Sequence, residues 1–207
     1  MLAAPCANPY FPDAPGTAWA YRIGGAAPER YRVKILAANA RGFIEKRTGG
    51  VPLTLHWTCT PSGWTLPSAD VVGTLPTMQS AFTMHAGAVV GTILPAAPMW
   101  HLGAAWTYAF PFRSTTATAN VTQTLVGHVT VSNAFIRTAH ETVPAGSYVA
   151  LEVRSRIVVA GTESLMGHTV PIHAAQTVIT DYVRGVGMIR TTSGIETTSL
   201  TSIVPPR

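Results

Sequence analysis

The stretches YVALEVRSRIVVA (residues 148–160) and HTVPIHAAQTVITDYV (residues 168–183) decide the fold of this chain. Apolar and polar side chains alternate through both, which is the pattern of a β-strand with one covered face. Each stretch is more than twice the usual strand length of about 5 or 6 residues. Strands this long twist and coil, and a strongly coiled antiparallel sheet tends to close into a half-barrel or a barrel.

Outward from this hairpin, strand signals dominate and no long stretch shows helical periodicity. The sequence predicts an all-β protein with a strongly curved antiparallel sheet (half-barrel or barrel), built from two meanders with little helix. We expect a single β domain over residues 1–207. Its first meander would cover 16–66, an irregular connection rich in Ala, Gly, Pro and Met would cover 67–102, and the second meander would cover 103–204.

The turns predicted within the second meander include two between its long strands. Ser132 and Asn133 separate a strand ending at Val131 from one beginning at Ala134. Residues 161–167 form the connection of the long hairpin, because they hold Gly at both ends.

Both meanders open on the pattern Gly-x-Ala-Trp-x-Tyr, at residues 16–21 and 103–108. Residues two apart on a strand share a face, so each Trp and Tyr pair points the same way. We expect these side chains to build the core. The alternative is an aromatic-lined cavity or a stacking platform for a ligand. The candidates for such a site are Trp19, Tyr21, Trp57, Trp64, Trp106 and Tyr108.

Charged residues make up only 11% of the chain, against about 25% in an average domain. The net charge of +5 arises from scarce acids rather than from basic clusters. The densest basic stretch, Arg30, Arg32 and Lys34, alternates with apolar residues and predicts the exposed face of a strand. Nucleic-acid grooves combine clustered cations with stacking aromatics, so we expect no nucleic-acid partner. A basic face toward anionic lipid or polysaccharide stays open.

Two cysteines, Cys6 and Cys59, predict a disulfide if the compartment is oxidising, and two separate buried thiols if it is not. Residues 2–6, Leu-Ala-Ala-Pro-Cys, look like the tail of a lipoprotein export signal, although Pro before the Cys fits poorly. Lipidation of Cys6 would exclude the disulfide, which we favour. We therefore expect an extracytoplasmic location, secreted or at the cell surface, with a leader missing from this chain. No apolar run is long enough for a transmembrane helix.

No catalytic signature is present. The seven His residues form no close metal motif, and no Gly-x-Ser-x-Gly occurs. Acids within strands, such as Glu45 and Glu152, alternate with apolar neighbours and are predicted to face solvent. We expect no catalytic residue, no metal and no cofactor. The alternative is an envelope-polymer hydrolase that uses a His/carboxylate pair drawn from His140, Glu141 and His168.

Several short motifs carry a resemblance to a known group. They are Asn-Pro-Tyr-Phe-Pro at 8–12 before the first Gly-x-Ala-Trp-x-Tyr, Val-Pro-Ala-Gly-Ser-Tyr at 143–148, and Tyr182 followed by Gly-Val-Gly at 185–187. Together they resemble a group of poorly characterised bacterial secreted proteins and lipoproteins. The resemblance implies an envelope or extracellular location and a curved sheet similar in outline to the LolA and LolB half-barrels. It implies no established enzyme activity.

These observations favour a non-enzymatic extracytoplasmic β protein. It would bind a hydrophobic, lipid-like ligand or pack as a protein subunit of a cell-envelope or extracellular assembly, since large buried interfaces are depleted in charge. The hairpin of residues 148–183 is the expected interacting element, because its edge could add to another sheet.

Overall fold

The computed structural model describes residues 6–25, 28–50, 52–67, 69–73, 82–118, 121–194 and 196–206. Almost all of its regular structure is strand, and one 3-10 turn spans Ala97–Met99. The strands are β1 (Ala18–Gly24), β2 (Glu29–Asn39), β3 (Gly42–Thr48), β4 (Leu53–Thr60), β5 (Gly63–Thr65), β6 (Ala69–Gly73), β7 (Phe82–Ala86), β8 (Val90–Gly91), β9 (Leu94–Pro95), β10 (Ala105–Thr118), β11 (Val121–Val143), β12 (Gly146–Leu165), β13 (His168–Val183), β14 (Gly187–Ser193) and β15 (Glu196–Val204).

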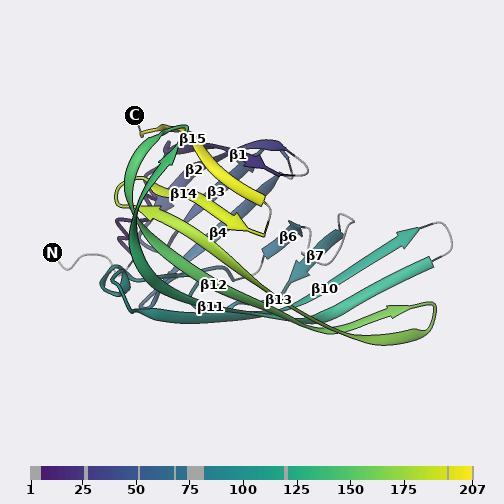
Figure 1. The fold of residues 1–207 in the computed structure, drawn as a ribbon. Coiled ribbons are helices and arrows are strands. Elements are labelled where there is room, and N and C mark those ends of the chain that lie inside the picture. The colour runs from purple at the N-terminus through teal and green to yellow at the C-terminus, as the bar shows by residue number, and fades with distance from the viewer. Residues whose placement is uncertain are drawn as a thin grey trace.

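All of these strands belong to one antiparallel sheet. Its order is β6-β7-β10-β11-β12-β13-β14-β15-β1-β2-β3-β4-β5-β9, and β8 pairs with β10 off this path. The order has two ends, so the sheet is open, and the predicted all-β, strongly curved antiparallel sheet is confirmed in its half-barrel form (Figure 1). Strands β1–β5 and β10–β15 meet where β15 pairs with β1.

The strands β10–β13 run out of the body together as a long arm (Figure 1). The predicted turn at Ser132 and Asn133 is wrong, because β11 passes through both residues without a break. Asn133 accepts a hydrogen bond from the Ser155 hydroxyl at 2.7 Å, so the polar pair is satisfied across the ladder and needs no turn. The predicted connection at 161–167 is too long, because β12 continues to Leu165 and only Met166 and Gly167 turn, both with positive φ.

Strong coiling of the arm depends on two glycines that face each other. Gly127 on β11 pairs with Gly161 on β12. A Cβ on Gly127 would lie 2.3 Å from the Ala160 carbonyl oxygen, and one on Gly161 would lie 2.2 Å from that of Val126. The missing side chains therefore let the two backbones approach closely at this crossing.

The far end of the β11–β12 hairpin bends over the body. The Ala145 amide, in the turn of this hairpin, donates to the Leu200 carbonyl on β15 at 3.2 Å. A bulge between Phe135 and Arg137 on β11 interrupts the ladder where the bend begins. The hairpin thus covers part of the half-barrel that a straight strand pair would leave open.

Aromatic rings fill the core of the body. Phe43 lies 4.8 Å from Trp64 and 5.5 Å from Trp57, measured between ring centres. The segment before β1 crosses this core, and the predicted disulfide between Cys6 and Cys59 joins it to β4. Closing so long a loop restricts the unfolded chain and stabilises the fold.

One long stretch of sheet edge is open in the described part of the chain. The strand β14 pairs with β13 only from Val178 onward, so residues 168–177 have a strand partner on the β12 side alone. None of these residues is Asp, Glu, Lys or Arg, and Pro171 is the one proline among them. Proline on an edge strand blocks pairing with another chain because it has no amide proton to donate.

We therefore expect Pro171→Val to promote self-association. The variant restores a donor to an uncharged edge, and strand-to-strand pairing between molecules becomes possible. Sedimentation velocity over a concentration series should show a larger species in Pro171→Val. Thr162→Val is the matched control, because it adds an exposed apolar side chain on β12, which has a strand on both sides. Equal association of both variants would contradict the role given to Pro171.

Candidate functional site: a basic groove on the outer face

The groove forms along β1 because the outward residues of that strand are small. Ala18 lies between Lys34 on β2 and Val204 on β15. Ala20 lies between Arg32 on β2 and Ser202 on β15. Residues paired across antiparallel strands share a face of the sheet, so two alanines form a floor with longer side chains on both sides.

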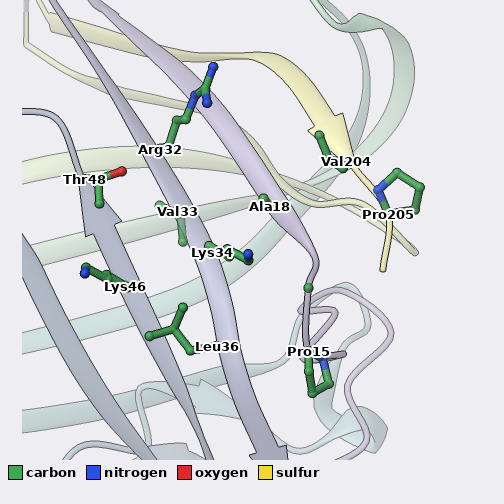
Figure 2. A pocket seen from close by; sticks show the side chains of 11 residues that line it. Pro15, Ala18, Arg32, Val33, Lys34, Leu36, Lys46, Thr48, Val204 and Pro205 are labelled. Carbon is green, nitrogen blue, oxygen red and sulfur yellow. The ribbon is translucent and has the colours of Figure 1, made fainter. Parts of the chain in front are cut away.

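The first half of the groove is a cleft of about 630 Å³. Figure 2 shows Arg32 and Lys34 on one strand, Lys46 on the neighbouring strand, and Val204 across from them. The lining residues are Pro15, Gly16, Ala18, Arg32, Val33, Lys34, Leu36, Lys46, Thr48, Val204 and Pro205. Three cations thus share one cleft with several apolar side chains.

The second half is a cleft of about 550 Å³ that shares Arg32 and Thr48 with the first. It adds Arg22 and Arg30, which pair directly across β1 and β2. From Gly16 to Arg22 the strand spans roughly 20 Å. The two clefts therefore form one groove, which we call the basic groove.

Five cations line the basic groove without an acidic partner in the described part of the chain. No Asp or Glu lines either cleft, and all five side chains are exposed. The neighbouring Glu29 occupies an odd position of β2, on the other face, where it lies 3.5 Å from Arg47. The five cations are Arg22, Arg30, Arg32, Lys34 and Lys46.

Sequence reasoning found three of these cations and missed the other two. The alternation of Arg30, Arg32 and Lys34 gave the exposed face of β2 directly. Arg22 and Lys46 join that face only through the cross-strand register, which pairs them with Arg30 and Lys34. Counting back from the turns that follow each strand could have supplied this register.

Three of the predicted aromatic candidates anchor the fold through their polar atoms. The Trp19 indole donates to the Val186 carbonyl at 2.6 Å. The Tyr21 hydroxyl donates to the Met188 carbonyl at 2.9 Å. Trp106 donates to a carbonyl of the connection before β10 at 3.0 Å.

Two of the other three candidates belong to the main core of the body, and the third packs against a separate core in the arm. Trp64 is 2% exposed in the body core, Trp57 stacks beside it on Phe43, and Tyr108 lies on the arm near Phe110. The structure therefore does not bring the six aromatic candidates together in one cavity. Tyr21 alone among them lines the basic groove, and a ligand role for these residues stays a prediction.

Glu45 was predicted to face solvent, and that prediction is wrong. Its side chain points to the concave face and accepts a hydrogen bond from the Trp57 indole at 3.2 Å. Burial raises the pKa of Glu45 to about 7, against a lowering by the Trp57 hydrogen bond and by Arg47. Burial likewise raises the pKa of Tyr31 to about 12. A protonated carboxyl is compatible with this apolar interior.

Glu152 was also predicted to face solvent, yet it is 3% exposed. It accepts hydrogen bonds from Arg137 at 2.8 and 3.0 Å. The bend of the β11–β12 hairpin places it, Glu141 and Asp181 within 4.8 Å of one another. Arg190 bridges Glu141 at 2.6 Å and Asp181 at 2.8 Å.

We call these five side chains the ion cluster. The ion cluster is a salt-bridge network in which Glu152 and Asp181 are buried, whereas the side chain of Arg137 is 66% exposed. Three carboxylates face two guanidinium groups, and one oxygen of Asp181 is buried without a described partner. Burial raises the pKa of Asp181, and the charge of Arg190 opposes that rise. Each carboxylate already has a cationic partner, Arg190 for Glu141 and Asp181 and Arg137 for Glu152, so we assign the cluster no ligand.

The residues of the hydrolase hypothesis do not form a shared cleft. His140 and Glu141 are neighbours on β11, and consecutive strand residues point to opposite faces. Glu141 turns inward to Arg190, whereas His140 is exposed. His168 lies at the tip of the arm, at the start of β13.

Comparisons with known proteins give a fold and no family. No family model matches the chain, and no curated protein matches it. The chain is similar to the crystal structure of a predicted exported protein with a YmcC-like fold from Bacteroides fragilis, at 15% identity, with a TM-score of 0.57 over 94% of this chain and 98% of that one. It is also similar to a predicted lipoprotein from Parabacteroides distasonis, at 12% identity, with a TM-score of 0.48 over 94% of this chain and 98% of that one.

The likeness to the Bacteroides fragilis protein supports the curved antiparallel fold. The LolA and LolB outline stays a prediction. Among the described residues, no helix has the length and apolar character needed to cross a membrane.

Proposed function

We propose that this chain is an extracytoplasmic binding protein that holds an anionic ligand in the basic groove. The observation that carries the proposal is a set of five exposed cations on one face with no acidic partner among the described residues. Arg and Lys side chains bind phosphate and carboxylate groups through charge-assisted hydrogen bonds. Unpaired cations around a trough also raise the local concentration of anions.

The extracytoplasmic location has separate support. A disulfide joins Cys6 and Cys59, and such bonds persist in oxidising compartments. The resemblance of the sequence to secreted proteins and lipoproteins points the same way. The open edge at 168–177 is the feature that the subunit hypothesis would use, and the residues named for the hydrolase hypothesis share no cleft. Both hypotheses stay predictions.

The proposal predicts that charge reversal in the groove abolishes most anion binding. In Arg32→Glu/Lys34→Glu, two attractive charges become repulsive in the middle of the groove. Affinity for a labelled inorganic polyphosphate, measured by fluorescence anisotropy at low salt, should fall more than tenfold, because each charge near a partner contributes about 1 kcal/mol. The remaining binding should weaken further as salt screens the charges.

The matched control is Arg154→Glu/Arg156→Glu, which makes the same change in net charge on the exposed surface of β12. This control should lose much less affinity than the groove variant. Equal losses in both would show that polyphosphate responds to net charge alone, and the proposed groove would then be wrong.

A further inference from the structure

Two exposed apolar side chains stand beside the cations of the basic groove. Leu36 is 47% exposed at one end of the first cleft, and Val204 is 55% exposed on its opposite wall. Figure 2 shows both in the same cleft as Lys34 and Lys46, with Pro205 next to Val204. An apolar side chain that is exposed beside these cations gains nothing from water or from a soluble anion.

The combination of charge and apolar surface fits one kind of partner. Anionic lipid bilayers present phosphate groups at the surface and acyl chains a few ångströms below it. Attachment of a peripheral protein to them combines electrostatic attraction with apolar insertion. We propose that the basic groove docks on an anionic lipid surface, with its cations on headgroup phosphates and with Leu36 and Val204 reaching the acyl boundary.

This inference rests on the proposed function, because it names the source of the anion. A nucleic acid is disfavoured, since single strands bind through stacking on exposed aromatic rings. The aromatic side chains of the groove are those of Tyr21 and Tyr31, which lie on the concave side of the sheet, where their rings stack on each other. A soluble polymer would use the cations and leave Leu36 and Val204 in water.

The long arm does not share this composition. Its tip exposes Met166, Val170 and Leu165, yet His168 and Glu163 are the nearby ionisable residues in the described hairpin. A tip without Lys or Arg lacks the electrostatic attraction to anionic lipid that the groove has. The docking surface is therefore assigned to the outer face of β1–β3.

The test is co-sedimentation with vesicles of phosphatidylcholine, with and without phosphatidylglycerol. We expect the protein to bind the phosphatidylglycerol vesicles, each groove cation contributing about fivefold to partitioning. The variant Leu36→Ser/Val204→Ser should bind these vesicles about tenfold more weakly, because two partly buried apolar side chains are lost. It should keep its affinity for inorganic polyphosphate, since its cations are intact.

The matched control is Leu102→Ser/Val149→Ser, because these side chains are 54% and 57% exposed and lie outside the groove. It should bind vesicles like the unaltered protein. If polyphosphate binds but phosphatidylglycerol vesicles do not, or if the Leu36→Ser/Val204→Ser variant binds them undiminished, the lipid surface is wrong and a soluble polyanion is the partner. If Arg32→Glu/Lys34→Glu leaves polyphosphate binding unchanged, the proposed function itself fails.

Discussion

Raising the pH from about 4.5 to about 7 is expected to lower the stability contribution of Glu45 by about 3 kcal/mol. Burial on the concave face raises the pKa of Glu45 from 4.5 to about 7 in the folded protein. Below the pKa of the unfolded state, 4.5, the Glu45 carboxyl is protonated in both states, and the free energy of unfolding does not depend on its titration. Between the pKa of the unfolded state and that of the folded state, the folded protein keeps a proton that the unfolded chain has released. Higher pH therefore favours unfolding.

The variant Glu45→Gln should remove this pH dependence. A glutamine oxygen can still accept the hydrogen bond from the Trp57 indole, which spans 3.2 Å, and it carries no charge into the interior. Above pH 7 the variant should be more stable than the unaltered protein by about 3 kcal/mol, and below pH 4 the two should be equal. Urea unfolding at a series of pH values measures both quantities.

Glu196→Gln is the control for Glu45→Gln, since it neutralises an exposed carboxylate at the start of β15. It should follow the pH profile of the unaltered protein. A residual slope should remain in Glu45→Gln, because burial also raises the pKa of Asp181 and acts in the same direction. Parallel profiles for Glu45→Gln and the unaltered protein would show that the carboxyl is ionised in the fold.

Alternation predicted most of the strands, and their length predicted the curvature. The pattern in residues 168–183 gave β13 with both of its ends, because a half-buried strand fixes which residues face the core. The length of that strand predicted the coiling, and the coiling predicted a half-barrel or a barrel, of which the structure has the half-barrel. The even number of cysteines favoured the Cys6–Cys59 disulfide over two buried thiols, and the structure confirms the disulfide.

Alternation could not predict what the curvature brings together. Glu45 and Glu152 look solvent-facing when one strand is read alone, because each alternates with apolar neighbours. The sheet curls until Glu45 lies against Trp57 on the concave face, and the β11–β12 hairpin bends until Glu152 is covered. Both outcomes depend on contacts between strands that are distant in sequence, so a local pattern carries no signal for them.

The basic groove shows the same limit in a milder form. The three cations of β2 were visible as an exposed face, and their role was left open between lipid and polysaccharide. The basic groove exists because the small residues Ala18 and Ala20 lie between β2 and β15. Since β15 is the last strand of the chain and β1 the first, this pairing spans almost the whole sequence, and the repeated Gly-x-Ala-Trp-x-Tyr gave no hint of it.

Arg190→Met is expected to destabilise the protein by about 3–5 kcal/mol, as the removal of one partner from a buried ion pair does. Arg190 is the cation between Glu141 on the bent hairpin and Asp181 on β13. Asp181 is 0% exposed, so its charge cannot reach water when the guanidinium is lost. Methionine preserves most of the apolar stem of Arg190. The loss of stability in Arg190→Met therefore measures the effect of removing the charge.

A second variant separates the charge from packing. In Glu141→Gln/Asp181→Asn/Arg190→Met, Arg190 and both of its partners are replaced together, so no charge at these positions is left unpaired. Most of the stability should return, because neutral replacement of all members of a buried ion triad is close to neutral in free energy. Lowering the pH should also rescue Arg190→Met, since protonation removes the unpaired charges.

We expect the removal of the Arg190 guanidinium to destabilise the bend of the β11–β12 hairpin first. If Arg190 holds that bend, amide exchange in Arg190→Met should accelerate first at Ala145, whose amide donates to Leu200 on β15, while amides in the arm keep their protection. A uniform acceleration would place the effect on global stability instead. A loss below about 1 kcal/mol, the range of surface ion pairs, would mean that the hairpin stays bent without Arg190.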